Sequence, residues 1–137
     1  MFTLIKILGR GRNVPEPKRY TLTENASLSY GTPATLAEGR LTPITATSTA
    51  PATHLVMAST EGKEALCARI SPDMIFETTL MTDAADLCIG TEYLLSADGH
   101  GLSATPASGS LRGACLFDNC DARKSGDTVL VYFQNGL

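Results

Sequence analysis

The sequence predicts an all-β fold, a small β-barrel or sandwich built from one domain of 137 residues. Short segments rich in β-branched and apolar residues recur at intervals of about 8–12 residues, and Gly, Pro and Asp separate them. No segment keeps a helical periodicity over three turns. A chain of this length buries enough surface for one core, whereas two independent cores would be hard to fit. No internal repeat and no low-complexity tract is evident.

The first segment, Phe2–Leu8, predicts a strand that is apolar on both of its faces. Such a strand is either central in a sheet or covered by another chain. Residues 9–17 contain two glycines and two prolines, which weaken regular structure and remove backbone donors, so they predict a linker. We therefore expect residues 1–18 to form an extended N-terminal arm with its linker, and residues 19–137 to form a β-rich body. The alternative is that the first strand folds back onto the sheet of its own body.

The body is predicted to be a series of short strands joined by turns. Residues 25–38 are rich in turn formers, and residues 35–38 have the pattern of one helical turn. The sequence Asp98-Gly-His-Gly101 gives the strongest hairpin signal in the chain. Extended segments are expected at residues 19–23, 41–46, 53–58, 64–70, 74–80, 93–95, 101–105, 111–117 and 128–133.

The last predicted strand is apolar on both sides. Val129, Val131 and Phe133 share one face, and Leu130 and Tyr132 share the other. One side is expected to pack into the core. Leu130 and Tyr132 are then candidates for a contact with a sister subunit.

The charge is distributed unevenly between the two parts of the chain. The net charge is -3, yet the first 20 residues carry five basic side chains and one acidic one, which leaves -7 for the remainder. A basic arm on an acidic body predicts either a contact with an acidic protein surface or a solubilising linker. Five charges over twenty residues with few aromatics make a poor phosphate-binding surface, so nucleic acid is not expected as a partner.

Neither a metal site nor a membrane segment is expected. The four cysteines, Cys67, Cys88, Cys115 and Cys120, form no C-x-x-C pair, and their spacing fits no common zinc pattern. They are expected to be reduced, and Cys120 alone lies in a polar turn where it would be exposed. No apolar run approaches the roughly 18 residues that span a bilayer, and no secretory signal is recognisable.

The sequence does not predict an enzyme or a cofactor. A Ser/His/Asp triad would need His54 or His100, but His100 lies in a glycine-rich turn and His54 begins an apolar strand. No G-x-S-x-G elbow is present, and Gly9-Arg-Gly-Arg12 lacks the pattern of a phosphate-binding loop. A small hydrolase that uses one of the two histidines is a remaining alternative.

Three stretches resemble the small decoration, or cement, proteins of tailed bacteriophages. The first is a Gly-Thr-Pro-Ala opening followed by Glu38-Gly-Arg-Leu-Thr-Pro43. The second is the hairpin-like Ile89–Gly99 with Leu102–Thr105 after it, and the third is Leu111–Phe117 followed by the closing strand Asp127–Phe133. The resemblance covers about residues 30–133. It implies a compact β-barrel or β-tulip-like body that clusters on the capsid surface.

The resemblance also implies a function and partners. The chain is expected to be a non-enzymatic virion protein, made in the host cytoplasm, that binds the major capsid protein and stabilises the lattice as a homo-oligomer, with a trimer favoured. Its arm would make the contact through Phe2, Leu4, Ile5, Lys6, Ile7, Arg10 and Arg12. The alternative is a carbohydrate-binding or adhesion module, although the chain has no tryptophan for sugar stacking.

Overall fold

The computed structural model describes residues 1–8, 16–23, 26–118 and 124–134, and these form eleven strands and no helix. The predicted all-β class is therefore confirmed. None of the described segments forms a helix long and apolar enough to span a membrane. The strands are β1 (Thr3–Ile7), β2 (Lys18–Leu22), β3 (Pro33–Ala37), β4 (Arg40–Pro43), β5 (His54–Glu61), β6 (Glu64–Arg69), β7 (Met74–Thr79), β8 (Glu92–Leu95), β9 (Leu102–Pro106), β10 (Ala114–Leu116) and β11 (Thr128–Tyr132).

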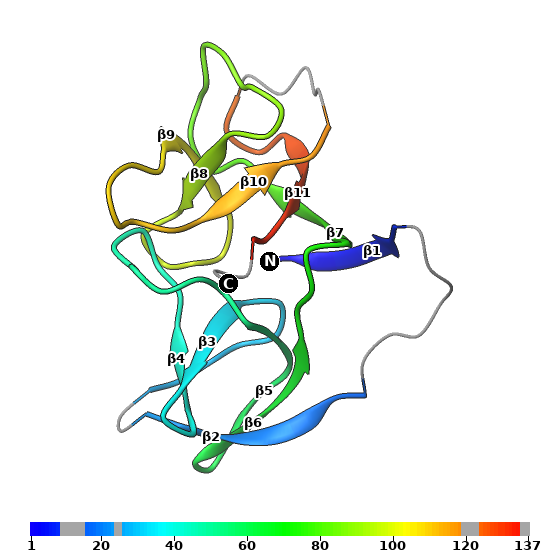
Figure 1. Cartoon of the computed structure of the whole chain (residues 1–137), viewed down its shortest axis with the longest axis vertical. Helices are drawn as coiled ribbons and strands as arrows, with labels where there is room; N and C mark the ends of the chain where they lie inside the picture. The colour runs from blue at the N-terminus through cyan, green and yellow to red at the C-terminus, as the bar shows by residue number, and fades with distance from the viewer. Residues whose placement is uncertain (9–15, 24–25, 119–123, 135–137) are drawn as a thin grey trace.

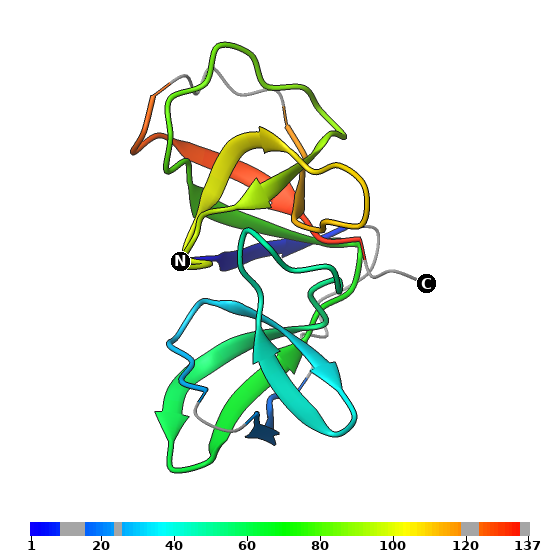
Figure 2. The same ribbon diagram turned by 90° about the vertical axis from the view of Figure 1, so that its left-hand side faces the viewer.

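The strands form two sheets, stacked one above the other (Figures 1 and 2). One sheet closes into a five-stranded barrel in the order β2-β4-β3-β5-β6, which we call the first unit. The other has six strands in the order β1-β7-β11-β10-β8-β9. Its strands β7 to β11 are called the second unit. Strand β1 is the edge strand of the six-stranded sheet but is counted in neither unit, and it lies between the two units in Figure 1.

The two units share one pattern of strand pairing. The antiparallel pairs β2–β6, β3–β4, β3–β5 and β5–β6 of the first unit correspond to β7–β11, β8–β9, β8–β10 and β10–β11 of the second. The parallel contact of Leu22 with Leu41 also has its counterpart, in the parallel bridge of Leu80 with Leu102. The chain therefore contains a structural repeat of strand pairing, which was not predicted from the sequence.

Backbone hydrogen bonds outside the strands repeat in the same way. The amide of Gly31 donates to Val56 and that of Gly90 donates to Leu116, each over 2.8 Å. Both glycines have positive φ, 79° and 82°, which side chains other than glycine rarely adopt. The repeat is also visible in the sequence, because Thr32 and Thr91 follow these glycines and the paired Leu36 and Leu41 recur as Leu95 and Leu102.

Strand β3 occupies residues for which the sequence predicts turns. The expected helical turn at residues 35–38 is wrong, because Pro33–Ala37 pairs with β4 on one side and with β5 on the other. Ala34 is fully buried in the barrel. Cross-strand pairing and burial outweigh the local turn propensity here.

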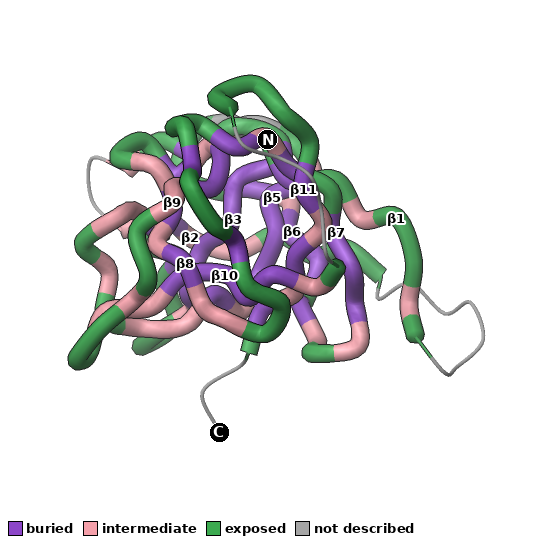
Figure 3. Tube along the Cα trace, turned by 90° about the horizontal axis from the view of Figure 1, so that it is seen from above, coloured by how far each residue is buried: buried purple, intermediate pink, exposed green. Residues whose placement is uncertain are grey.

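Two clusters of buried side chains replace the single core that the chain length predicts. A small cluster fills the first unit, around Leu22, Leu41 and Val56. A larger one fills the second unit and extends to the first, because Leu55 and Ile70 of the first unit belong to it. The units are thus joined by continuous apolar packing, with buried residues at the centre of the molecule (Figure 3).

The first strand lies on the sheet of its own body, which is the fold-back alternative. It pairs antiparallel with β7, from Thr3 opposite Glu77 to Ile7 opposite Met74, with a bulge between Leu4 and Lys6. It forms one edge of the six-stranded sheet. Figure 3 shows this strand at the side of the molecule, with exposed and half-buried residues.

Candidate protein-binding surface

Two kinds of candidate catalytic residue, a histidine and the cysteines, can be placed in the structure. No group of three or more His, Cys, Asp or Glu side chains within them could hold a metal ion. His54 is buried, shares a 2.8 Å hydrogen bond with the Thr53 hydroxyl, and packs edge-on against Tyr20 at 4.7 Å between ring centroids. Burial, and then the nearby Arg69 charge, lower the pKa of His54. It therefore has the contacts of a structural histidine.

Two of the three described cysteines are poorly suited to nucleophilic chemistry. Cys67 and Cys115 are each 1% exposed. Burial raises the pKa of Cys67 to about 11 and raises the pKa of Cys115 as well, so both remain thiols at neutral pH. Cys88 is exposed and, like the other two, forms no disulfide. Cys120, predicted to be exposed, lies outside the described residues.

An open groove lies on the second unit. Its walls include Met81 and Leu94 together with the polar side chains of Ser96, Asp98 and Ser103. Hydrogen bonds from the Ser96 hydroxyl and the His100 amide lower the pKa of Asp98. No aromatic residue is among those that line the groove, so it offers no ring on which a sugar could stack.

The second unit and β1 present another surface on the side of the sheet that faces away from the larger core. Side chains alternate along a strand, and Leu116, Val129, Val131 and Phe133 point into that core. Their neighbours therefore point outward. We call Ile5, Lys6, Phe117, Leu130 and Tyr132 the outer face.

Strand β1 joins this face through side-chain contacts. The Lys6 ammonium lies over the Phe117 ring, 5.3 Å from its centroid, and the Phe117 amide donates to Leu130 over 2.9 Å. Ile5 is 44% exposed, and Leu8 just beyond the strand is 40% exposed. The sheet thus ends in an apolar edge that carries one positive charge.

The structure separates the residues that sequence reasoning assigned to the arm. Phe2 is fully buried, with its ring centroid 5.5 Å from that of Phe133, so it is a core residue and is not available to a partner. Leu4 and Ile7 pack partly against the same core. Ile5 and Lys6 remain accessible. Arg10 and Arg12 lie outside the described residues.

Leu130 and Tyr132 are half-buried and lie on the outer face, as the alternation along β11 predicts. Their contact with a sister subunit stays a prediction. Sequence reasoning missed Phe117 and Leu8 as surface residues. Phe117 follows the buried Leu116 by one position, and this alternation was the available signal.

No model of a known protein family matches the chain, and no curated protein matches its sequence. The function is therefore inferred from the surface described above and from the sequence itself.

Proposed function

We propose that this chain is a structural virion protein that binds the outer surface of a bacteriophage capsid lattice and stabilises it. The observation that carries the proposal is the accessible apolar edge of the sheet, where Ile5 and Leu8 are exposed beside Lys6. Exposed apolar side chains grouped at one place favour a protein contact. The resemblance of residues 30–133 to decoration proteins supports a capsid as the partner.

The contact is made by side chains more than by strand addition. An added strand needs a regular row of free backbone groups, but β1 has a bulge between Leu4 and Lys6. A bulge and a lysine are devices that protect an edge from indiscriminate pairing. The outer face can instead bind an apolar patch with acidic neighbours, because Lys6 supplies a positive charge.

Many weak contacts suffice for this function. A lattice presents the same binding site repeatedly, and copies held together on it gain effective concentration without new contacts. The small apolar patch around Ile5 fits a weak individual contact of this kind.

The test compares two substitutions of the same chemistry. Ile5→Glu places a carboxylate on the edge, whereas Ile89→Glu does so at a residue that is 59% exposed and lies outside the outer face. Both variants should fold, as circular dichroism would show. In co-sedimentation with DNA-free tailed-phage capsids that lack decoration protein, Ile5→Glu should lose most binding and Ile89→Glu should bind like the wild type. Equal binding by both variants would overturn the assignment of the edge.

Deleting the first strand is a poor test, because Phe2 belongs to the core. The carbohydrate-binding alternative has one observation in its favour, an aromatic residue, Tyr30, that is 47% exposed. A glycan array with the wild-type protein tests it, and a hit lost in Tyr30→Ala would favour that function over capsid binding.

A further inference from the structure

Strands β3 and β5 meet at one seam of the closed barrel in the first unit. Ala34 pairs with His54 there, and the Thr53 amide donates to the Ala34 carbonyl oxygen over 2.9 Å. Further along β3, the Leu36 amide donates to the Thr53 hydroxyl over 2.7 Å. The seam therefore depends at this point on a side chain, and not on the backbone alone.

The same hydroxyl is bonded to a buried histidine. Thr53 Oγ1 lies 2.8 Å from Nδ1 of His54, which is 5% exposed. The Leu36 amide can donate but not accept, so the hydroxyl accepts this bond and keeps its own proton to give. Among the described residues, Nδ1 is the acceptor that lies within reach of this proton. His54 is therefore neutral, with its own proton on Nε2.

The groups that face His54 do not favour a positive charge on it. Arg69 lies opposite His54 in the pairing of β5 with β6, and its charge adds to burial in lowering the pKa of the histidine. Tyr20 of β2 packs edge-on against the ring, and β3 contributes the uncharged Ala34. The contacts of His54 with the described residues include no carboxylate.

A further proton on His54 would break the bond with Thr53. It must bind to Nδ1, which then becomes a donor and can no longer accept from the hydroxyl. The imidazolium would also be buried beside Arg69 without an anionic partner, which costs free energy. Both effects act where β3 meets β5, so protonation weakens the closure of this barrel.

The second unit has an alanine at the corresponding place. Ala114 pairs with Tyr93 across β10 and β8, as His54 pairs with Ala34 across β5 and β3. Ala114 is fully buried and cannot take up a proton. The repeat of strand pairing thus places an internal comparison within the same chain.

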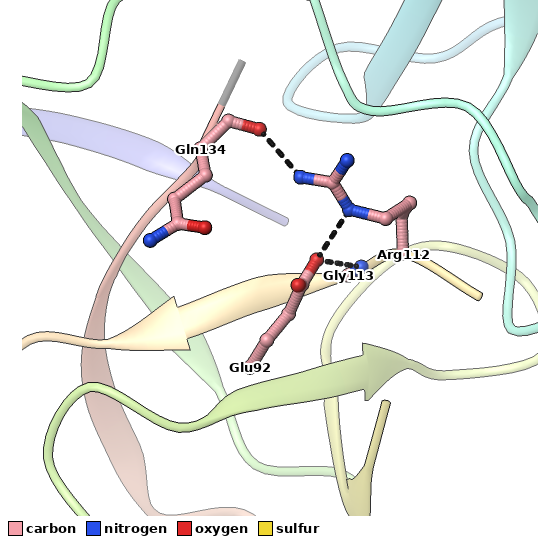
Figure 4. Close-up of polar contacts among 4 residues, drawn as sticks. All are labelled: Glu92, Arg112, Gly113 and Gln134. Atoms are coloured by element: carbon pink, nitrogen blue, oxygen red, sulfur yellow. Dashed lines mark hydrogen bonds and ion pairs between the residues drawn. The ribbon is translucent and has the colours of Figure 1, made fainter. Parts of the chain in front are cut away.

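The link beside this alanine is also different. Gly113 stands where the first unit has Thr53, and its amide donates to a Glu92 carboxylate oxygen over 2.7 Å (Figure 4). Arg112 Nε donates to the same oxygen over 3.2 Å, and Arg112 Nη2 donates to the Gln134 carbonyl oxygen over 3.0 Å. The seam between β8 and β10 is therefore held by an ion pair and does not use an imidazole.

The first unit also has the smaller of the two cores, around Leu22, Leu41 and Val56. Because buried apolar surface is the main source of stability, a part of a protein with a small core opens at a lower cost than the whole. We propose that His54 is an acid-sensitive switch, whose protonation opens the seam between β3 and β5 and loosens the first unit while the second unit stays closed. This inference does not rest on the proposed capsid binding.

Hydrogen–deuterium exchange read by mass spectrometry tests the switch, at about pH 7.5 and about pH 5.5 and with rates corrected for the intrinsic effect of pH. In the wild type, protection of the β3 and β5 amides should fall at least about threefold on acidification, and that of the β8 and β10 amides should fall less. His54→Gln keeps a neutral acceptor for the Thr53 hydroxyl, so its β5 protection should be the same at both pH values. An equal fall in both units of the wild type, or an undiminished fall in His54→Gln, would overturn the proposal.

If His54→Gln does not fold, Arg69→Gln decides, since Arg69 is exposed. Removing its charge takes away one cause of the lowered pKa of His54, so the fall in β5 protection should be smaller than in the wild type. The matched control is Lys63→Gln, which removes an exposed cation at the other end of the same hairpin and should show the wild-type fall. Equal falls in the wild type and both variants would overturn the proposal.

Discussion

The rings of Phe2 and Phe133 lie 5.5 Å apart between centroids, at the two ends of the described chain. Phe133 also meets Phe76 edge-on at 5.4 Å, so three aromatic side chains pack together, from the residue before β1, from β7 and from the residue after β11. All three are at most 1% exposed. The first strand is thereby part of the fold, and what remains of it for a partner is its outward side.

Phe2→Ala should lower the free energy of unfolding by about 3–5 kcal/mol, because it removes a fully buried aromatic ring and leaves a cavity. Urea unfolding followed by fluorescence or circular dichroism measures this change. Ile5→Ala on the same strand is the control and should cost under about 1 kcal/mol, since Ile5 is largely exposed. Similar losses for the two variants would mean that Phe2 is not in the core.

Gly113→Ala should prevent stable folding. A Cβ atom at this position would lie 1.9 Å from the Tyr93 carbonyl oxygen, which belongs to the backbone of β8 and cannot move freely. Gly90→Ala is the comparison, because a Cβ there meets nothing within 4 Å and the cost comes from its positive φ alone, about 1 kcal/mol. Thermal denaturation of both variants would show whether the backbone clash at Gly113 lowers the stability more than the positive φ at Gly90.

The protein should lose stability as the pH falls below about 6.5, the ordinary pKa of histidine. Because the pKa of His54 is lowered in the folded state, the unfolded chain binds the proton first, and protonation favours unfolding between 6.5 and the lower folded value. His54→Gln should flatten the pH dependence of the unfolding free energy in this window. An unchanged pH dependence in His54→Gln would contradict the assignment.

Cys88 should react with a thiol reagent in the folded protein, and Cys67 and Cys115 should not. Cys88 is exposed, whereas burial raises the pKa of the other two thiols and excludes the reagent. Mass spectrometry after brief alkylation at pH 8 identifies the modified residues. Adding urea should make Cys67 and Cys115 reactive together, since both lie in parts that unfold with the cores. Modification of Cys67 without urea would contradict its burial.

The alternation of inward and outward side chains along a single strand could be predicted from the sequence. The pattern of apolar residues within the strand itself shows which face packs on the core. In β11, Val129 and Val131 point inward and Leu130 and Tyr132 outward, as predicted. The place of the first strand could not be predicted, since apolar residues on both faces fit either a free arm or a sheet, and the choice depends on pairing with Glu77 far along the chain.

The repeat of strand pairing was not predicted from the sequence, although the sequence carries a weak signal for it. The units share turn glycines such as Gly31 and Gly90, but the residues at their corresponding surfaces differ, as Ile70 and Gln134 do. The pair Gly31-Thr32 recurs as Gly90-Thr91, and Leu36 and Leu41 recur as Leu95 and Leu102. Matches this sparse become convincing only when the strand registers align them.

Electron cryo-microscopy of the wild-type protein bound to tailed-phage capsids tests the central claim most directly. The proposed function predicts density that places the outward side of β1, with Ile5 and Lys6, against the capsid protein. Density that places the groove around Ser96 and Asp98 against the capsid, or saturating protein with no bound density, would contradict it.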